Sequence, residues 1–186
     1  MPVTEHRRWT ADEVRALPEE PGKRLEVIDG ELIVSPGPSL MHQRVAVVLM
    51  KILEAHICLG REAYVLFGPG EIEPDPHTLV QPDVFVVAPV NGKCPPTTEL
   101  IGDIYLICEI ISPSSGRIDR VRKRSLYQRM GVEYWILDPS ARLVERWLAC
   151  DDRPMMHDAA IIWSDVHLST PLTIDLEELF AEALDR

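Results

Sequence analysis

Hydrophobic and polar residues alternate over residues 24–35 (RLEVIDGELIVS), on both sides of an Asp29-Gly30 pair. A period of two is typical of half-buried strands, and Asp-Gly suits a type I′ turn, in which both central residues have positive φ. The pattern therefore predicts a β-hairpin near the N-terminus. Before it, Thr10 and Glu13 have the spacing of a capping box, which predicts a short helix.

A helical period replaces this alternation over residues 40–58. Apolar residues recur there every three or four positions, and Gly60 follows where such a helix is expected to end. The residues of this apolar stripe are Val45, Val48, Leu49 and Ile52. His42 lies on the same stripe, so we expect it to face the interior of the protein.

Three nearly continuous apolar runs follow, over residues 63–67, 80–87 and 103–111. Runs of this kind suit strands that are buried on both faces of a sheet. Residues 89–100, between the last two runs, have the composition of a loop. We therefore expect three strands in this part of the chain.

The second half of the chain continues with a helix at about 119–130, for which Gly131 is the natural stop. The later expected elements are a strand over 133–137, a strand over 143–149 that Glu145 and Arg146 mark as an exposed edge, and an amphipathic helix over 176–184. A helix between two strands implies a crossover connection. The sheet is therefore expected to be mixed rather than purely antiparallel.

The composition bounds the class of protein. The chain has 186 residues, of which 46% are hydrophobic, and this fits a single globular domain over residues 1–186. The apolar runs are too short to cross a bilayer and no signal-peptide pattern opens the chain, so a cytoplasmic protein without a membrane partner is expected. The four cysteines form no CxxC pair, which argues against a structural zinc site.

The formal charge of −11 argues against a general nucleic-acid binder, because phosphate contacts require Lys and Arg. Residues 117–129 nevertheless hold five arginines and one lysine against the single acid Asp119. This run is either a local basic patch that contacts a nucleic acid or the solvated face of a helix.

Two carboxylates occur at unusual places in the apolar runs. Glu109 is the one charged residue within the span Ile104–Ile111, where an unpaired carboxylate would be costly. Asp83 directly follows a proline within the run 80–87. If the two strands are neighbours, both carboxylates can share a hard cation such as Mg²⁺, which activates water and stabilises charge on a phosphate. The alternative is that Asp83 merely begins a strand and Glu109 merely ends one.

The second helix brings a lysine to the same place. One helical face carries Asp119, Lys123, Leu126, Tyr127 and Met130. Its apolar residues should anchor that face to the core, so Lys123 is expected near Glu109, where its charge could stabilise a phosphoryl group. The alternative is a lysine that pairs with Asp119 along the helix. Two roles are open for His42. It could orient substrate or transfer a proton, or it could be a core histidine whose hydrogen bonds are satisfied.

Together, these motifs resemble the bacterial Uma-type family of restriction-endonuclease-like proteins, formerly a domain of unknown function. The resemblance extends over about residues 9–182. It rests on EVIDGEL (26–32), SPGPS (35–39), His42, QPDV (81–84), EIISPS (109–114), Asp119, Lys123, Tyr127, GVEYW (131–135) and Asp138-Pro139.

The resemblance implies an α/β fold with the restriction-endonuclease-like PD-(D/E)xK core, in which a helix, three strands, a helix and a strand (αβββαβ) form a mixed sheet flanked by helices, here with an N-terminal β-hairpin. It also implies cleavage of phosphodiesters that depends on Mg²⁺ or Mn²⁺. Asp83, Glu109 and the backbone carbonyl of Ile110 would be the metal ligands.

One position departs from the family pattern. The lysine of the superfamily should lie two residues after Glu109, where this chain has Ile111. Lys123 is the candidate substitute. Glu26 is a further candidate for the site, either as a hairpin residue or as a neighbour of the metal.

Three functions are compatible with these observations. The first is a metal-dependent endonuclease whose partner is a nucleic acid, with DNA expected as the substrate and a homodimer suited to cutting both strands. The second is a catalytically inactive binding or assembly module with the nuclease fold, which Ile111 and the charge of −11 favour. The third is a metal hydrolase that acts on another phosphate ester.

Overall fold

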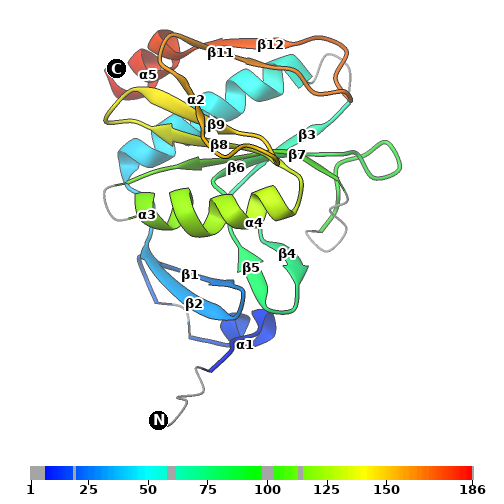
Figure 1. Cartoon of the computed structure of the whole chain (residues 1–186), viewed down its shortest axis with the longest axis vertical. Coiled ribbons are helices and arrows are strands. Elements are labelled where there is room, and N and C mark those ends of the chain that lie inside the picture. The colour runs from blue at the N-terminus through cyan, green and yellow to red at the C-terminus, as the bar shows by residue number, and fades with distance from the viewer. Residues whose placement is uncertain (1–6, 19, 58–61, 98–102, 113–114, 186) are drawn as a thin grey trace.

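A six-stranded sheet forms the centre of the computed structural model (Figure 1), with its strands in the order β10-β9-β8-β7-β6-β3. The structure describes residues 7–18, 20–57, 62–97, 103–112 and 115–185. The strands of the central sheet are β3 (Tyr64–Phe67), β6 (Val84–Val87), β7 (Ile104–Ile110), β8 (Glu133–Asp138), β9 (Leu143–Trp147) and β10 (Met155–His157). β7 and β8 are parallel and the other neighbours are antiparallel, so the expected mixed sheet is confirmed.

Helices cover both faces of this sheet (Figure 1). One face packs against the long helix α2 (Leu40–Ile57), the C-terminal helix α5 (Leu176–Leu184) and the hairpin of β11 (Ala160–Trp163) and β12 (Leu172–Asp175). The other face packs against α3 (Gly116–Ile118), the π-helical turn η2 (Asp119–Lys123) and α4 (Arg124–Arg129), which follow one another without a break. Each face of β6, β7 and β8 therefore contacts a separate apolar cluster, as their continuous apolar runs predict.

A second sheet lies on the α3–α4 side of the molecule, near the N-terminus (Figure 1). Its strands are β1 (Lys23–Ile28), β2 (Glu31–Pro36), β4 (Ile72–Asp75) and β5 (Thr78–Val80), in the order β2-β1-β5-β4. The predicted hairpin is confirmed, because β1 and β2 pair and Asp29 and Gly30 between them have φ of 54° and 85°. The capping box is confirmed as well: helix α1 (Ala11–Arg15) begins after Thr10, whose side chain accepts a hydrogen bond from the Glu13 amide.

The prediction of a single strand over residues 80–87 was wrong. β5 ends at Val80 and β6 begins at Val84, and the two strands belong to different sheets. Pro82 has no amide hydrogen to donate to a neighbouring strand, which explains why the chain leaves one sheet here and enters the other. Asp83 therefore lies immediately before β6, where the two sheets meet.

The predicted exposed edge at residues 143–149 was also wrong. β9 is flanked by both β8 and β10, and the side chain of Glu145 is buried and accepts a hydrogen bond from Arg120 Nε at 2.6 Å.

The helix expected at 119–130 is present but irregular, because its first turn has the π-helical form. The expected helix stop at Gly60 lies outside the described residues. None of the described helices is long and apolar enough to cross a membrane.

Candidate active site

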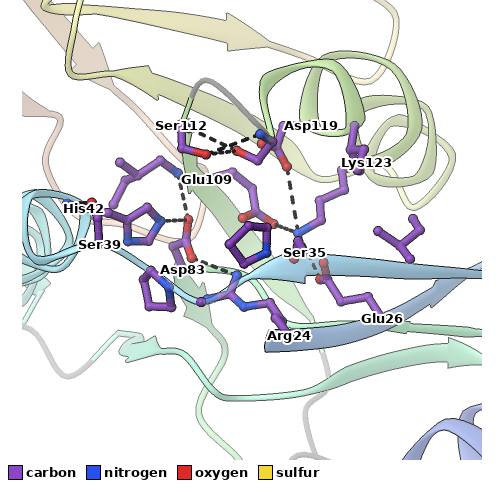
Figure 2. A pocket seen from close by; sticks show the side chains of 17 residues that line it. Arg24, Glu26, Ser35, Ser39, His42, Asp83, Glu109, Ser112, Asp119 and Lys123 are labelled. Atoms are coloured by element: carbon purple, nitrogen blue, oxygen red, sulfur yellow. Dashed lines mark hydrogen bonds and ion pairs between the residues drawn. The ribbon is translucent and has the colours of Figure 1, made fainter. Parts of the chain in front are cut away.

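Asp83 forms one half of a cluster of charged side chains between the two sheets (Figure 2). Its Oδ1 accepts a hydrogen bond from Arg24 at 3.0 Å, and its Oδ2 lies 2.8 Å from His42 Nε2 and 2.8 Å from the amide nitrogen of Ile110. Burial opposes ionisation of Asp83. The hydrogen bond from His42 and the charges of His42, Arg24 and Lys123 outweigh burial and hold the pKa of Asp83 well below its ordinary value.

Glu109 and Lys123 form the other half of the cluster. Lys123 Nζ lies 2.8 Å from Glu109 Oε1 and 2.9 Å from Glu26 Oε1, and the Tyr127 hydroxyl donates to Glu109 Oε1 at 3.0 Å. Asp119 Oδ1 is farther from the ammonium, at 3.9 Å. The predicted approach of Lys123 to Glu109 is thus present in the structure, and the lysine contacts two carboxylates from other elements in addition to its helical neighbour.

The strand register explains why these residues meet. β6 and β7 are antiparallel, with Val84 opposite Cys108 and Phe85 opposite Ile107. Continuing the same register by one residue places Asp83 opposite Glu109. The two strands are therefore neighbours, which is the condition under which the sequence predicted a pair of carboxylates.

The cluster contains more carboxyl groups than cationic side chains. Glu26, Asp83, Glu109 and Asp119 are all buried, whereas the permanent cations among them are Arg24 and Lys123. Burial raises the pKa of Glu109 well above its ordinary value, and the nearby carboxylates add to this against the opposing charge of Lys123. Burial likewise raises the pKa of Asp119 to about 6, although Lys123 opposes it. Without a further cation, protons must neutralise part of this cluster.

Lys123 itself stays protonated. Burial lowers the pKa of its ammonium, but the charges of Glu109, Glu26 and Asp119 outweigh burial and raise that pKa above its ordinary value. The site therefore presents a fixed positive charge beside the carboxylates at any physiological pH.

These side chains line a cavity of about 190 Å³, whose wall also includes Ser35, Ser39 and Ser112 (Figure 2). Among the described residues, no group of three or more His, Cys, Asp or Glu side chains is arranged to hold a metal ion. Two adjacent carboxylates nevertheless fit Mg²⁺, which prefers oxygen ligands and keeps several waters in its shell. The excess negative charge of the cluster fits a divalent cation as well.

The structure places every predicted side chain of the site in this one cavity: Glu26, His42, Asp83, Glu109 and Lys123 all line it, and so does Ile110. For Ile110 the described contact is made by its amide, so the role of its carbonyl as a ligand stays a prediction. The sequence left two roles open for Glu26, a hairpin residue or a neighbour of the metal. In the structure Glu26 contacts Lys123 and accepts a hydrogen bond from the Gln81 amide at 2.8 Å.

Sequence reasoning missed Arg24. A signal was available, because Arg24 and Glu26 are two positions apart in an alternating strand and so point to the same face. Once Glu26 was a candidate for the site, the same alternation placed Arg24 beside it.

The mixed sheet between helical layers, with a carboxylate before β6 and another near the end of β7, defines the restriction-endonuclease-like fold. The chain belongs to the Uma2 family, whose model, described as "Putative restriction endonuclease", matches residues 11–153. A solved structure with the same fold is that of "a putative nuclease belonging to DUF820 from Anabaena variabilis ATCC 29413". It is 21% identical and matches with a TM-score of 0.75 over 95% of this chain and 99% of that one. No curated protein matches the chain.

Proposed function

We propose that this protein is a metal-dependent endonuclease that hydrolyses phosphodiester bonds, with DNA as the substrate. The observation that carries the proposal is the convergence of Asp83, Glu109 and Lys123 in one cavity, although they come from three separate segments. Two carboxylates and an ammonium are the groups that such hydrolysis requires: ligands for a hard cation and a positive charge for the phosphoryl oxygens.

Asp83 and Glu109, with the carbonyl of Ile110, would hold the metal. When bound, Mg²⁺ or Mn²⁺ supplies a nucleophilic water and polarises the phosphate. Lys123 stabilises the negative charge that develops on the phosphoryl oxygens, and its contact with Glu26 keeps the ammonium in place. His42 and Arg24 orient the carboxylate of Asp83 through the hydrogen bonds that they share with it.

A second candidate is a binding or assembly module that retains the fold without catalysis. Ile111, which stands where the superfamily usually has a lysine, favours this second candidate. The internal pairing of the basic residues at 117–129 favours it as well. Several of these residues already pair with acids of this chain, Arg120 with Glu145, Arg122 with Glu31 and Arg129 with Asp29. These arginines are therefore less available to phosphates than the sequence suggested.

The test is a calorimetric titration of Mg²⁺ and Mn²⁺ into wild type and Asp83→Asn, beside a plasmid-nicking assay with both proteins. Asp83→Asn keeps the shape of the side chain and removes its charge. Asp158→Asn, the same change at an exposed acid between β10 and β11, is the matched control. Loss of metal binding and of nicking in Asp83→Asn alone supports the nuclease.

Each other outcome selects a different function. Metal binding without nicking of plasmid favours a hydrolase that acts on another phosphate ester. Absence of metal binding by the wild-type protein contradicts the proposal and leaves the binding module. Nicking that survives equally in Asp83→Asn would come from a contaminant or from a different site.

A further inference from the structure

A second, mainly apolar cavity of about 270 Å³ opens beside the candidate active site. Arg24, Pro38, His42 and Asp83 line both cavities, so the two cavities are neighbours that share this wall. The apolar walls come from two elements: Val47 and Met50 belong to α2, and Phe67 ends β3. A ligand that fills both cavities must therefore combine a polar, charged part with an apolar part.

Phe67 is the most unusual residue of the apolar cavity. Its side chain is 60% exposed, whereas Phe85 and Phe180 are fully buried. Backbone contacts hold it close to the active site: Phe67 pairs with Val84, and the amide of Gly68 donates to the Asp83 carbonyl at 3.1 Å. An exposed aromatic ring that the sheet holds beside a catalytic cavity is a suitable surface for a ligand ring.

We propose that this cavity binds an unpaired nucleobase of the substrate strand, stacked on Phe67, next to the phosphodiester that lies in the active site. The inference rests on the proposed nuclease function and specifies its substrate as single-stranded or locally unpaired nucleic acid. Both faces of a base inside a duplex are covered by its neighbours, so only an unpaired base can offer a face to Phe67. The volume lies just below the roughly 300 Å³ at which sites for drug-sized ligands begin, which suits one ring system.

The shared charged wall is the reason to prefer a nucleotide over an apolar segment of a second protein copy. An apolar protein side chain would cover the wall of Arg24, His42 and Asp83 without offering a polar group to it. A nucleotide supplies a flat base for Phe67 and, a few bonds away, a phosphate for the neighbouring cavity. Stacking on an aromatic ring tolerates any base, so we expect little sequence preference at this position.

The experiment measures binding of a single-stranded oligonucleotide that contains 2-aminopurine, and of the matching duplex, in Ca²⁺ with gel controls for cleavage. We expect the wild-type protein to bind the single strand more tightly and to quench its fluorescence. Phe67→Ala should weaken single-strand binding about 5- to 100-fold, and Phe67→Tyr, which keeps the ring, should restore it. Ile162→Ala, at an exposed apolar position on β11, is the control and should bind as wild type does.

Unchanged single-strand affinity in Phe67→Ala, or tighter binding of the duplex by wild type, would overturn the inference. So would light scattering that shows Phe67→Ala separating a dimer while oligonucleotide binding is retained, because the cavity would then be a contact between copies. Nicking of plasmid or of circular single-stranded DNA by wild type in Mn²⁺ separates this inference from the proposed function. Nicking with no effect of Phe67→Ala on binding removes only the base site, whereas a wild-type protein that neither nicks nor binds removes both.

Discussion

At the scale of single residues, the proposed chemistry of the site depends most on Lys123. Its side chain is 3% exposed, and a buried ammonium is tolerated only where carboxylates and hydrogen bonds replace its hydration. Glu109 and Glu26 supply that replacement from two different sheets. The same contacts keep the lysine charged and hold it at the cavity in which we propose that the phosphate binds.

Replacement of Lys123 by Met should therefore affect both stability and activity. We expect plasmid nicking to fall by about 100-fold or more, because a preorganised charge is lost. Unfolding free energy should also fall, by about 3–5 kcal/mol at pH 8, because the carboxylates lose their partner. The loss of unfolding free energy should be smaller at pH 5, where protons neutralise the carboxylates in place of the lysine. Nicking rates and urea unfolding measure these effects, with Lys51→Met on the exposed face of α2 as the control.

The acidic pair Glu109 and Asp119 predicts an unusual pH dependence of the metal-free protein. A carboxyl group whose pKa is raised in the folded state stabilises that state below its unfolded pKa and loses this contribution as the pH rises through its folded pKa. For Asp119 the rise is from 3.8 to about 6. Unfolding free energy should thus decrease between about pH 4 and pH 6, on the order of 2–3 kcal/mol for this group.

Asp83 changes the unfolding free energy with pH in the opposite direction, but at lower pH. Its lowered pKa gives stability that is present above its unfolded pKa and lost on further acidification. Urea unfolding in EDTA at pH 4.5, 6 and 7.5 tests the window of Asp119, and Asp119→Asn should flatten the decrease. A variant with the same pH slope as wild type would show that another group is responsible. Bound Mn²⁺ should offset the decrease above pH 6.

At the scale of elements, the pairing of β6 with β7 brings the two carboxylates together, and the segment from α3 to α4 adds the lysine. A π-helical turn over Asp119–Lys123 lies between α3 and α4 in that segment, and such turns occur often at functional sites. β7 lies in the middle of the sheet between both apolar clusters, so its side chains from Leu106 to Ile110 are among the least accessible of the described residues.

Cys108 on β7 reports on this burial. Burial raises the pKa of its thiol well above the ordinary value, with the charges of Glu133 and Glu109 adding to it, and the thiolate is the reactive form. We expect iodoacetamide to label the exposed Cys94 and Cys150 in the native protein within minutes and to leave Cys108 unlabelled until unfolding. Peptide mass spectrometry measures the labelling at each site. Modification of Cys108 as fast as Cys94 would contradict the central position of β7.

At the scale of the whole molecule, the chain carries a formal charge of −11, and much of its basic run is paired internally. Among the described residues of this run, Arg120, Arg122 and Arg129 already have acidic partners, which leaves fewer cations to displace counterions from DNA. The contact that we propose with substrate should then depend on the active site more than on a broad basic face.

This charge distribution predicts a weak dependence of substrate binding on salt. The slope of log K against log[KCl] reflects the number of phosphates that the protein neutralises, about 0.9 for each in duplex DNA and 0.7 in single strands. We expect a slope of magnitude about 3 or less between 50 and 200 mM KCl, by fluorescence anisotropy. A steep slope, of magnitude about 6 or more, would show that a larger basic surface engages the substrate. The homodimer stays a prediction that sedimentation of the same samples tests.

The local pattern of the sequence predicted the elements whose signal is local. The capping box at Thr10, the turn at Asp29-Gly30 and the C-terminal helix at Leu176–Leu184 follow from residues adjacent in the chain. Alternation and helical period also gave the inward direction of His42 and Lys123, because a side chain's face is determined by its position within its own element.

Contacts between distant segments could not be predicted in the same way. The break at Pro82 and the cover of β9 by β10 depend on which strands pair, and short strands such as β10 carry too few residues for a period. The approach of Arg24 and Glu26 to the site depends on how one sheet packs against the other. Residue type thus determined which side chains could do the chemistry. Only the tertiary structure decided that Arg24, Glu26, Asp83, Glu109 and Lys123 share one cavity, because burial joins charges that are far apart in the chain.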